Sequence, residues 1–129
     1  MPWVEIFAVF IVSHLVGDFL LQTDLQAIRK RGGLGVNRDS WRGLLSHTVT
    51  YTLAFVPALI WLATDIGAWA IGVGALIALP HMIQDDGHLL DAFMRRVKGV
   101  EPKPGGLLIA VDQSWHVLAL FLVSLLAGT

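Results

Sequence analysis

Seven ionisable side chains lie inside four stretches of the chain that are otherwise almost wholly apolar. Three of these four stretches carry a His/Asp pair separated by four residues, which places both side chains on one face of a helix, about one turn apart. Imidazole and carboxylate together suit zinc, manganese or iron, so the pattern predicts a divalent-metal site. The predicted ligands are His14, Asp18, His47, His81, Asp85, Asp112 and His116.

The order within the pairs reverses when the direction of the chain reverses. In the first and third apolar stretches the histidine precedes the aspartate, and in the fourth the aspartate precedes the histidine. In a bundle whose first and third helices run toward the cytoplasm, all three aspartates therefore lie nearer the cytoplasm than their histidines. His47 enters the second stretch from its cytoplasmic end, near the level of the aspartates. We expect four helices to direct polar groups to one depth, close to the cytoplasmic side.

Three further polar side chains extend the same helix faces. Gln22 follows the aspartate of the first stretch by four positions, and His88 follows the histidine of the third by seven. Gln113 is adjacent to the aspartate of the fourth stretch. We expect Gln22, His88 and Gln113 to support the metal ligands from outside and not to bind the ion themselves.

Such a cluster is compatible with three functions. Four histidines and three aspartates exceed one tetrahedral zinc shell, so they could hold two metals, or one metal with aspartates orienting the histidines. The leading prediction is a membrane-embedded, metal-dependent hydrolase acting on a lipid or lipid-linked substrate at the cytoplasmic leaflet. A proton or metal-ion transporter or channel subunit is the main alternative, because Asp and His residues form proton relays in membranes.

The third alternative is a structural or partner-binding membrane protein, in which the pairs only join the helices. A charged group at the bilayer centre costs roughly 2.5–3.5 kcal/mol, whereas an interhelical hydrogen bond in a membrane returns roughly 0.6 kcal/mol. Seven such groups at one depth therefore favour a functional site. A Ser/His/Asp triad using Ser46 or Ser114 is disfavoured, because no nucleophile elbow surrounds either serine.

The composition indicates an integral membrane protein. Of the 129 residues 55% are hydrophobic, and the mean hydropathy of +0.67 exceeds that of ordinary soluble domains. The absence of cysteine excludes disulfides, thiolate ligands and a cysteine nucleophile. No nucleic-acid-binding motif is present, so no nucleic-acid partner is expected. The first apolar stretch lacks a basic start and a small-residue cleavage site, and we expect a retained helix and not a signal peptide.

Four stretches approach the roughly 20 mostly apolar residues that a membrane-spanning helix needs. Helix is the expected form, because backbone groups in hydrocarbon must be paired within their own segment. The predicted fold class is all-α, a four-helix transmembrane bundle that forms one domain over residues 1–129. The predicted spans are 2–22, 41–63, 66–84 and 106–127.

All nine Lys and Arg residues lie in two connections, within residues 29–42 and 95–103. The positive-inside rule places both connections in the cytoplasm and both termini on the other side of the inner (cytoplasmic) membrane. Residues 86–98 combine helically spaced apolar side chains with Arg95, Arg96 and Lys98. They are expected either to lie on the membrane as an amphipathic helix that contacts anionic headgroups, or to extend the third span. The expected partners are membrane lipids, with a second copy of the chain as a further candidate.

Four strings of the sequence together resemble a bacterial inner-membrane family known as domain of unknown function 3307. They are SHLVGDFLLQTD (13–24), LLSHTVTYTL (44–53), LPHMIQDDG (79–87) and VDQSWHVLAL (111–120). The resemblance spans nearly the whole chain and implies the fold and the site, but no reaction. The chain departs from the family pattern at residues 86–88, where members often carry a longer aliphatic, Lys-bearing stretch. By position, the resemblance implies site residues His14, Asp18, Gln22, His47, His81, Asp85, Asp112, Gln113 and His116.

Overall fold

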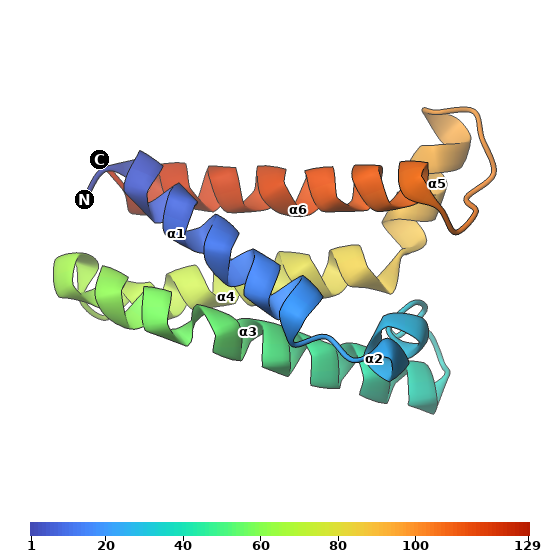
Figure 1. Ribbon diagram of the computed structural model, residues 1–129, viewed down its shortest axis with the longest axis horizontal. Helices are drawn as coiled ribbons and strands as arrows, with labels where there is room; N and C mark the ends of the chain where they lie inside the picture. Colours follow the sequence, from blue (N-terminus) through green and yellow to red (C-terminus); the bar gives the residue numbers. More distant parts are fainter.

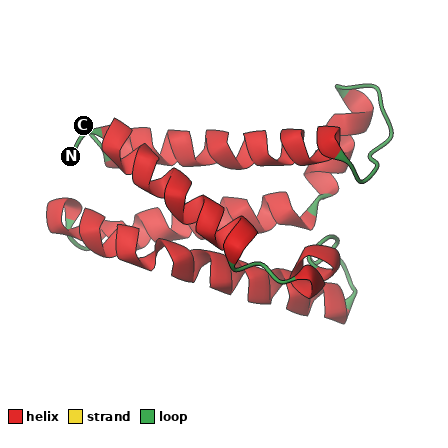
Figure 2. Cartoon of the chain, in the orientation of Figure 1, coloured by secondary structure: helices red, strands yellow, loops and turns green.

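The computed structural model describes all 129 residues and contains helices and connections but no strand (Figure 2). The all-α prediction is therefore confirmed. Of the four long helices, α1 packs on α3 and α6, and α4 packs on the same two neighbours (Figure 1). The elements in order are α1 (Trp3–Leu15), the π-helical η1 (Val16–Leu20), α2 (Asp24–Arg29), α3 (Arg38–Ile66), α4 (Trp69–Asp86), α5 (His88–Arg96) and α6 (Gly106–Ala127).

Three helices are long and apolar enough to cross a membrane. They are Trp3–Leu20, which joins α1 to η1, Arg38–Ile66 and Gly106–Ala127. Helix α4 corresponds to the predicted span 66–84 and has 18 residues. The mean hydropathy of α4 is lower than that of the most apolar 18-residue stretch in each of the other three long helices. The reason is its last turn, which consists of Gln84, Asp85 and Asp86.

Apolar side chains cover much of the outside of the molecule. Val12, Leu53, Ile60 and Ile71 are all more than half exposed, and they come from α1, α3 and α4. Soluble monomers rarely expose apolar surface on this scale. The exterior and the three long apolar helices together indicate association with a membrane.

The two ends of the molecule differ in chemistry. Both termini and the turn between α3 and α4 lie at one end, and the basic connections lie at the other (Figure 1). The ammonium group of Met1 contacts Asp65 at 2.8 Å, and the amide of Thr129 donates to the Met1 carbonyl at 3.0 Å. Between these ends, the half of the bundle nearer the termini is filled by an apolar core that includes Ile6, Phe55, Leu62 and Val123.

Helix α5 is a separate helix and does not extend α4. Gly87 stands between them with φ 85°, a left-handed conformation that glycine adopts without steric cost. The alternative that residues 86–98 extend the third span is therefore wrong. The contact of α5 with anionic headgroups stays a prediction.

The segment after α1 folds in a way that the sequence analysis did not expect. The helix continues through the π-helical turn η1, and π-turns occur frequently at functional sites. The chain then turns back as α2, which packs on α3. A capping box between Thr23 and Gln26 begins this short helix. The first basic connection is consequently a folded element and not an open loop.

Candidate metal centre

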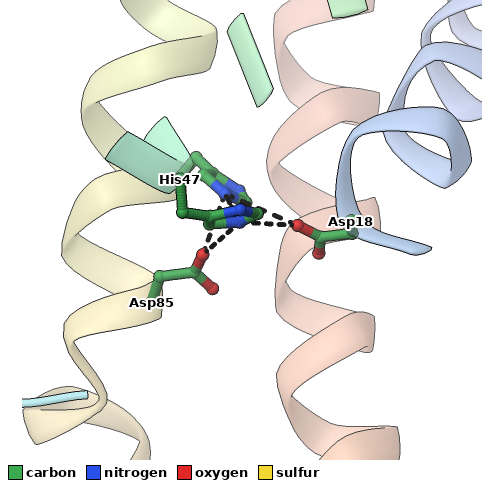
Figure 3. A group of neighbouring side chains, drawn as sticks. Asp18, His47 and Asp85 are labelled. Carbon is green, nitrogen blue, oxygen red and sulfur yellow. Dashed lines mark hydrogen bonds and ion pairs between the residues drawn. The ribbon is translucent and has the colours of Figure 1, made fainter. Parts of the chain in front are cut away.

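Four buried side chains converge on one point, at the end of the apolar core that faces the basic connections. Asp18 comes from η1, His47 from α3, and His81 and Asp85 from α4. One nitrogen or oxygen atom of each lies within 4.8 Å of the others. All four residues are at most 4% exposed. Figure 3 shows His47 between the carboxylates of Asp18 and Asp85.

The spacing of these four atoms is close to that of a tetrahedral metal shell. Nε2 of His47 lies 3.0 Å from Oδ1 of Asp18, 2.9 Å from Oδ2 of Asp85 and 3.0 Å from Nε2 of His81. Nε2 of His81 lies 2.9 Å from the same Asp85 oxygen and 3.6 Å from the same Asp18 oxygen. Ligands bound to tetrahedral zinc at 2.0–2.1 Å stand about 3.3 Å apart. Small outward movements would therefore suffice to admit an ion.

Hydrogen bonding alone leaves this cluster incompletely satisfied. Neither carboxylate oxygen of Asp85 makes a hydrogen bond of good geometry. Oδ1 is ion-paired with the Lys30 ammonium at 3.1 Å, and Oδ2 lies 2.9 Å from the Nε2 atoms of both His47 and His81. The Nε2 atoms of His47 and His81 face each other, and only one proton fits between them. Buried polar atoms without partners are costly, and a divalent cation would satisfy the converging lone pairs. The donor set, two imidazoles and two carboxylates, fits zinc, manganese or iron.

The remaining nitrogens of the two ligand histidines depart from the usual pattern of metal sites. Nδ1 of a metal-bound histidine usually donates to a carboxylate or carbonyl, but Nδ1 of His47 and of His81 has no partner here. The ring of Tyr51 instead stacks on His81, with ring centroids 3.4 Å apart and planes 4° apart. On the side of the His81 ring that carries Nδ1, packing therefore takes the place of the usual hydrogen bond.

A second group of possible ligands comprises Asp85, Asp112 and His116. Nδ1 of His116 donates to the backbone carbonyl of Asp112 at 2.7 Å, which leaves the lone pair of Nε2 facing Oδ1 of Asp85 at 3.2 Å. The ammonium of Lys30 lies 3.1 Å from that same Asp85 oxygen. Lys30 thus supplies a positive charge beside the Asp85 oxygen that a second ion would share.

His14 and Gln113 form a chain of hydrogen bonds that ends on Asp18. The Tyr51 hydroxyl and Nδ1 of His14 are 3.0 Å apart, and Nε2 of His14 lies 2.8 Å from Oε1 of Gln113. Because an amide oxygen only accepts, Nε2 donates to it and Nδ1 accepts from Tyr51. The Gln113 amide then donates to Oδ2 of Asp18 at 3.2 Å. His14 therefore lies outside both groups, and Gln113 connects it to Asp18.

The other two predicted supporting residues lie in different surroundings. Gln22 donates to the backbone carbonyl of Asp18 at 3.3 Å, beside the cluster. His88 is mostly exposed and hydrogen-bonds to Asp86 away from the converging atoms. The Asp86 carboxylate also accepts a hydrogen bond from the Leu34 amide at 2.8 Å.

Sequence reasoning missed three residues that shape the site, namely Gly17, Lys30 and Tyr51. Tyr51 follows His47 by four positions, the same spacing that singled out the His/Asp pairs, so this signal was available. Lys30 carried no such signal, because its approach to the cluster depends on the reversal of the chain at α2.

A cavity of about 680 Å³ extends from the cluster toward the end of the molecule that carries the basic connections. Asp18, Asp85 and Asp112 line its inner part, and residues of α2, α5 and the start of α6 line the remainder. The cavity therefore leads from the basic end of the molecule to the candidate site, where the Asp18 and Asp85 side chains themselves are almost fully buried.

Comparison with known families supports the resemblance seen in the sequence. Residues 6–129 match the family described as "Protein of unknown function (DUF3307)". No curated protein and no solved structure matches the chain. The match covers nearly the whole chain, including every residue of the candidate metal centre, and the protein therefore belongs to the DUF3307 family.

Proposed function

We propose that this protein is a membrane-embedded, metal-dependent hydrolase that acts on a lipid or lipid-linked substrate. The observation that carries the proposal is the near-tetrahedral convergence of buried atoms from Asp18, His47, His81 and Asp85. A bound divalent ion at this point supplies Lewis-acid polarisation of the substrate and activation of water. Zinc is the first candidate because of the tetrahedral spacing, with manganese and iron as the others.

The proposed placement is a four-span bundle in the inner membrane, with α4 as the fourth span. Helix α4 packs between α3 and α6, so it crosses the bilayer if they do. The basic residues, all at one end of the molecule, mark that end as cytoplasmic, and both termini then face the other side. The metal centre would lie in the cytoplasmic half of the bilayer.

The distribution of polar groups supports an enzyme over a transporter. The half of the bundle nearer the termini is filled by the apolar core, and Phe10, Phe55 and Leu62 are fully buried there. The cavity, in contrast, reaches the cluster from the basic end. A transport pathway would need polar groups or water continuing to the opposite face, whereas an enzyme needs access from one side only.

Asp112 is positioned for proton transfer. It lines the cavity but is not one of the four converging ligands. Its carboxylate can therefore accept a proton from a water molecule in the cavity, next to the proposed ion. The Gln113 amide, 3.4 Å from Oδ2 of Asp112, and the nearby His116 ring help to orient this carboxylate.

Elemental analysis of the purified, metal-exposed protein tests the proposal. Wild-type protein and His88→Ala should retain a stoichiometric amount of metal, because His88 lies away from the cluster. His81→Ala and Asp85→Asn should lose it, because each removes a converging ligand. Equal, near-zero metal in all four proteins would remove the proposal and leave a structural role for the cluster.

A further inference from the structure

We propose that the substrate is a membrane amphiphile with a phosphate headgroup, bound in the cavity between the metal and the side chains of Lys30 and Arg95. This inference rests on the proposed metal-dependent function. It adds the chemical class of the substrate and names residues that recognise it. The argument comes from the charge of the cavity, the surroundings of its cations and the apolar side of its wall.

The net charge of the cavity lining changes sign when a divalent ion binds. Four carboxylates and three cationic side chains line the cavity, so the lining carries a net charge of −1 without an ion and +1 with one. An anionic headgroup would be repelled from the metal-free cavity and attracted to the loaded one. A neutral ester or amide would gain nothing from this reversal. The charged lining residues are Asp18, Lys30, Arg31, Asp85, Asp91, Arg95 and Asp112.

Lys30 is the cation nearest to the proposed ion. Its ammonium lies 3.1 Å from Oδ1 of Asp85, and its side chain is only 13% exposed. A phosphate oxygen bound beside Asp85 would therefore lie within reach of the ammonium. Charge-assisted hydrogen bonds of this kind are about twice as strong as neutral ones, and they favour a phosphate over an uncharged group.

Two further arginines, Arg31 and Arg95, line the same cavity, and they differ in how firmly they are paired. Arg31 pairs with Asp91 at 2.6 Å and Arg95 pairs with Glu101 at 3.2 Å. The Arg95 pair is largely solvent-exposed, and such pairs contribute little to stability. A phosphate that offers two oxygens to a guanidinium can displace a weak carboxylate partner. Arg95 is therefore available to a headgroup that enters the cavity.

The wall of the cavity continues onto the apolar exterior. Phe19, Ile28 and Ile109 line the cavity and are each more than half exposed. They come from η1, α2 and α6, and Figure 1 shows α2 and the beginning of α6 well apart at this end of the molecule. A headgroup in the cavity could therefore keep its hydrocarbon chain against these side chains and the surrounding lipid. This arrangement favours an amphiphile over a water-soluble phosphate.

The reaction consistent with this arrangement is hydrolysis of a phosphate ester. The oxygen of water forms a bond to phosphorus while the bond from phosphorus to the alcohol oxygen breaks. The electron pair of that bond stays on the alcohol oxygen, which takes up the proton that the water loses. The products are the lipid alcohol and inorganic phosphate, and no further co-reactant is needed.

The test compares three probes on detergent-purified, metal-loaded protein: phosphatidic acid, diacylglycerol with the same chains, and glycerol phosphate. Thermal unfolding reports binding, and release of inorganic phosphate reports turnover. Phosphatidic acid should raise Tm and release phosphate, and the other two should produce much smaller shifts in Tm. Removing the ion should abolish the shift, because the lining then returns to net negative charge.

Matched variants separate recognition from general surface charge. Lys30→Gln should weaken the apparent affinity for phosphatidic acid about tenfold, and Arg95→Gln should weaken it by less, because Arg95 is more exposed. Arg96→Gln should behave as wild type, because Arg96 is the neighbour of Arg95 on α5 but does not line the cavity. Metal content is measured for each variant, so that loss of the ion is not mistaken for loss of recognition.

Each contrary result identifies the step that failed. A metal-loaded protein that responds equally to diacylglycerol and phosphatidic acid, or to neither, overturns phosphate recognition and leaves the metal centre standing. If glycerol phosphate raises Tm as much as phosphatidic acid does, the proposal that the substrate is an amphiphile is overturned. Equal losses in Arg95→Gln and Arg96→Gln overturn the role of the cavity arginine. A protein that binds no metal removes the proposed function itself.

Discussion

Gly17 is expected to be essential for the metal centre although it carries no side chain. It lies in the π-helical turn η1, directly against the aromatic ring of Tyr51. A Cβ added at Gly17 would lie 2.7 Å from Cδ2 and 3.3 Å from Cα of Tyr51. The same Tyr51 ring is stacked on His81. Gly17→Ala therefore pushes on a ring that orients a predicted metal ligand.

The size of the effect follows from these distances. Carbon atoms in contact normally stand about 3.5–4.0 Å apart, so Tyr51 must move by about 1 Å. Overpacking of this kind costs about 1–3 kcal/mol, part of which is offset by the roughly 1 kcal/mol that alanine gains over glycine in a helix. Disturbing a group that supports a metal ligand typically lowers metal affinity about 10-fold to 100-fold. We expect a loss of affinity in this range with only a modest loss of stability.

A competition titration with a zinc chelator measures the affinity, and thermal unfolding measures the stability. Gly72→Ala is the matched control, because Gly72 also lies in a helix and an added Cβ there meets no atom within 4 Å. The control should bind zinc as wild type does. Wild-type affinity in Gly17→Ala would refute the reasoning, because the stack of Tyr51 on His81 would then not position the ligand.

Three further predictions follow from the site and its proposed placement. Tyr51→Phe removes the hydroxyl that donates to His14, and it should lower zinc affinity about tenfold in the same chelator titration, less than loss of a ligand would. Asp112→Asn should retain metal by elemental analysis but lower the rate of phosphate release from phosphatidic acid about 100-fold to 10,000-fold; wild-type turnover would exclude Asp112 as the base. The chain lacks cysteine, so Lys98→Cys and Thr129→Cys give single labelling sites. A membrane-impermeant maleimide added to intact cells should label the variant at 129 and spare the variant at 98, and the opposite pattern would reverse the proposed topology.

The spacing of four within each pair, and its reversal in the last helix, predicted that seven side chains share one site, and the structure brings six of them into two groups that share Asp85. The sequence did not indicate which atoms of these side chains face one another. The same spacing did not distinguish His81, whose Nε2 atom belongs to the candidate site, from His14, whose nitrogens do not. Only the packing of Tyr51 and Gln113 around His14 shows that its two nitrogens already have protein partners.

The long helices could be predicted from the length of their apolar stretches. The turns between them could not be predicted in this way. The bounds of α6 agree with the expected span, and α3 begins three residues before its expected start because Asn37 caps it there. The π-turn at residues 16–20 and the reversal at α2 leave no trace in hydropathy. Both depend on contacts with α3 that form only when the helices pack. The position of Lys30 could not be predicted for the same reason.

The adjacent aspartates at the end of α4 explain how a surface connection reaches a buried site. Asp85 points into the cluster, and Asp86 holds the first basic connection, accepting from the Gly32 amide at its carbonyl (2.7 Å) and from the Leu34 amide at its carboxylate (2.8 Å). These two bonds fix the chain just beyond Lys30, whose ammonium then reaches Asp85. One turn of α4 therefore supplies both a candidate metal ligand and the attachment for the cation beside it. The position of Lys30, and with it the proposed contact to a substrate phosphate, therefore depends on the same helix that carries His81 and Asp85.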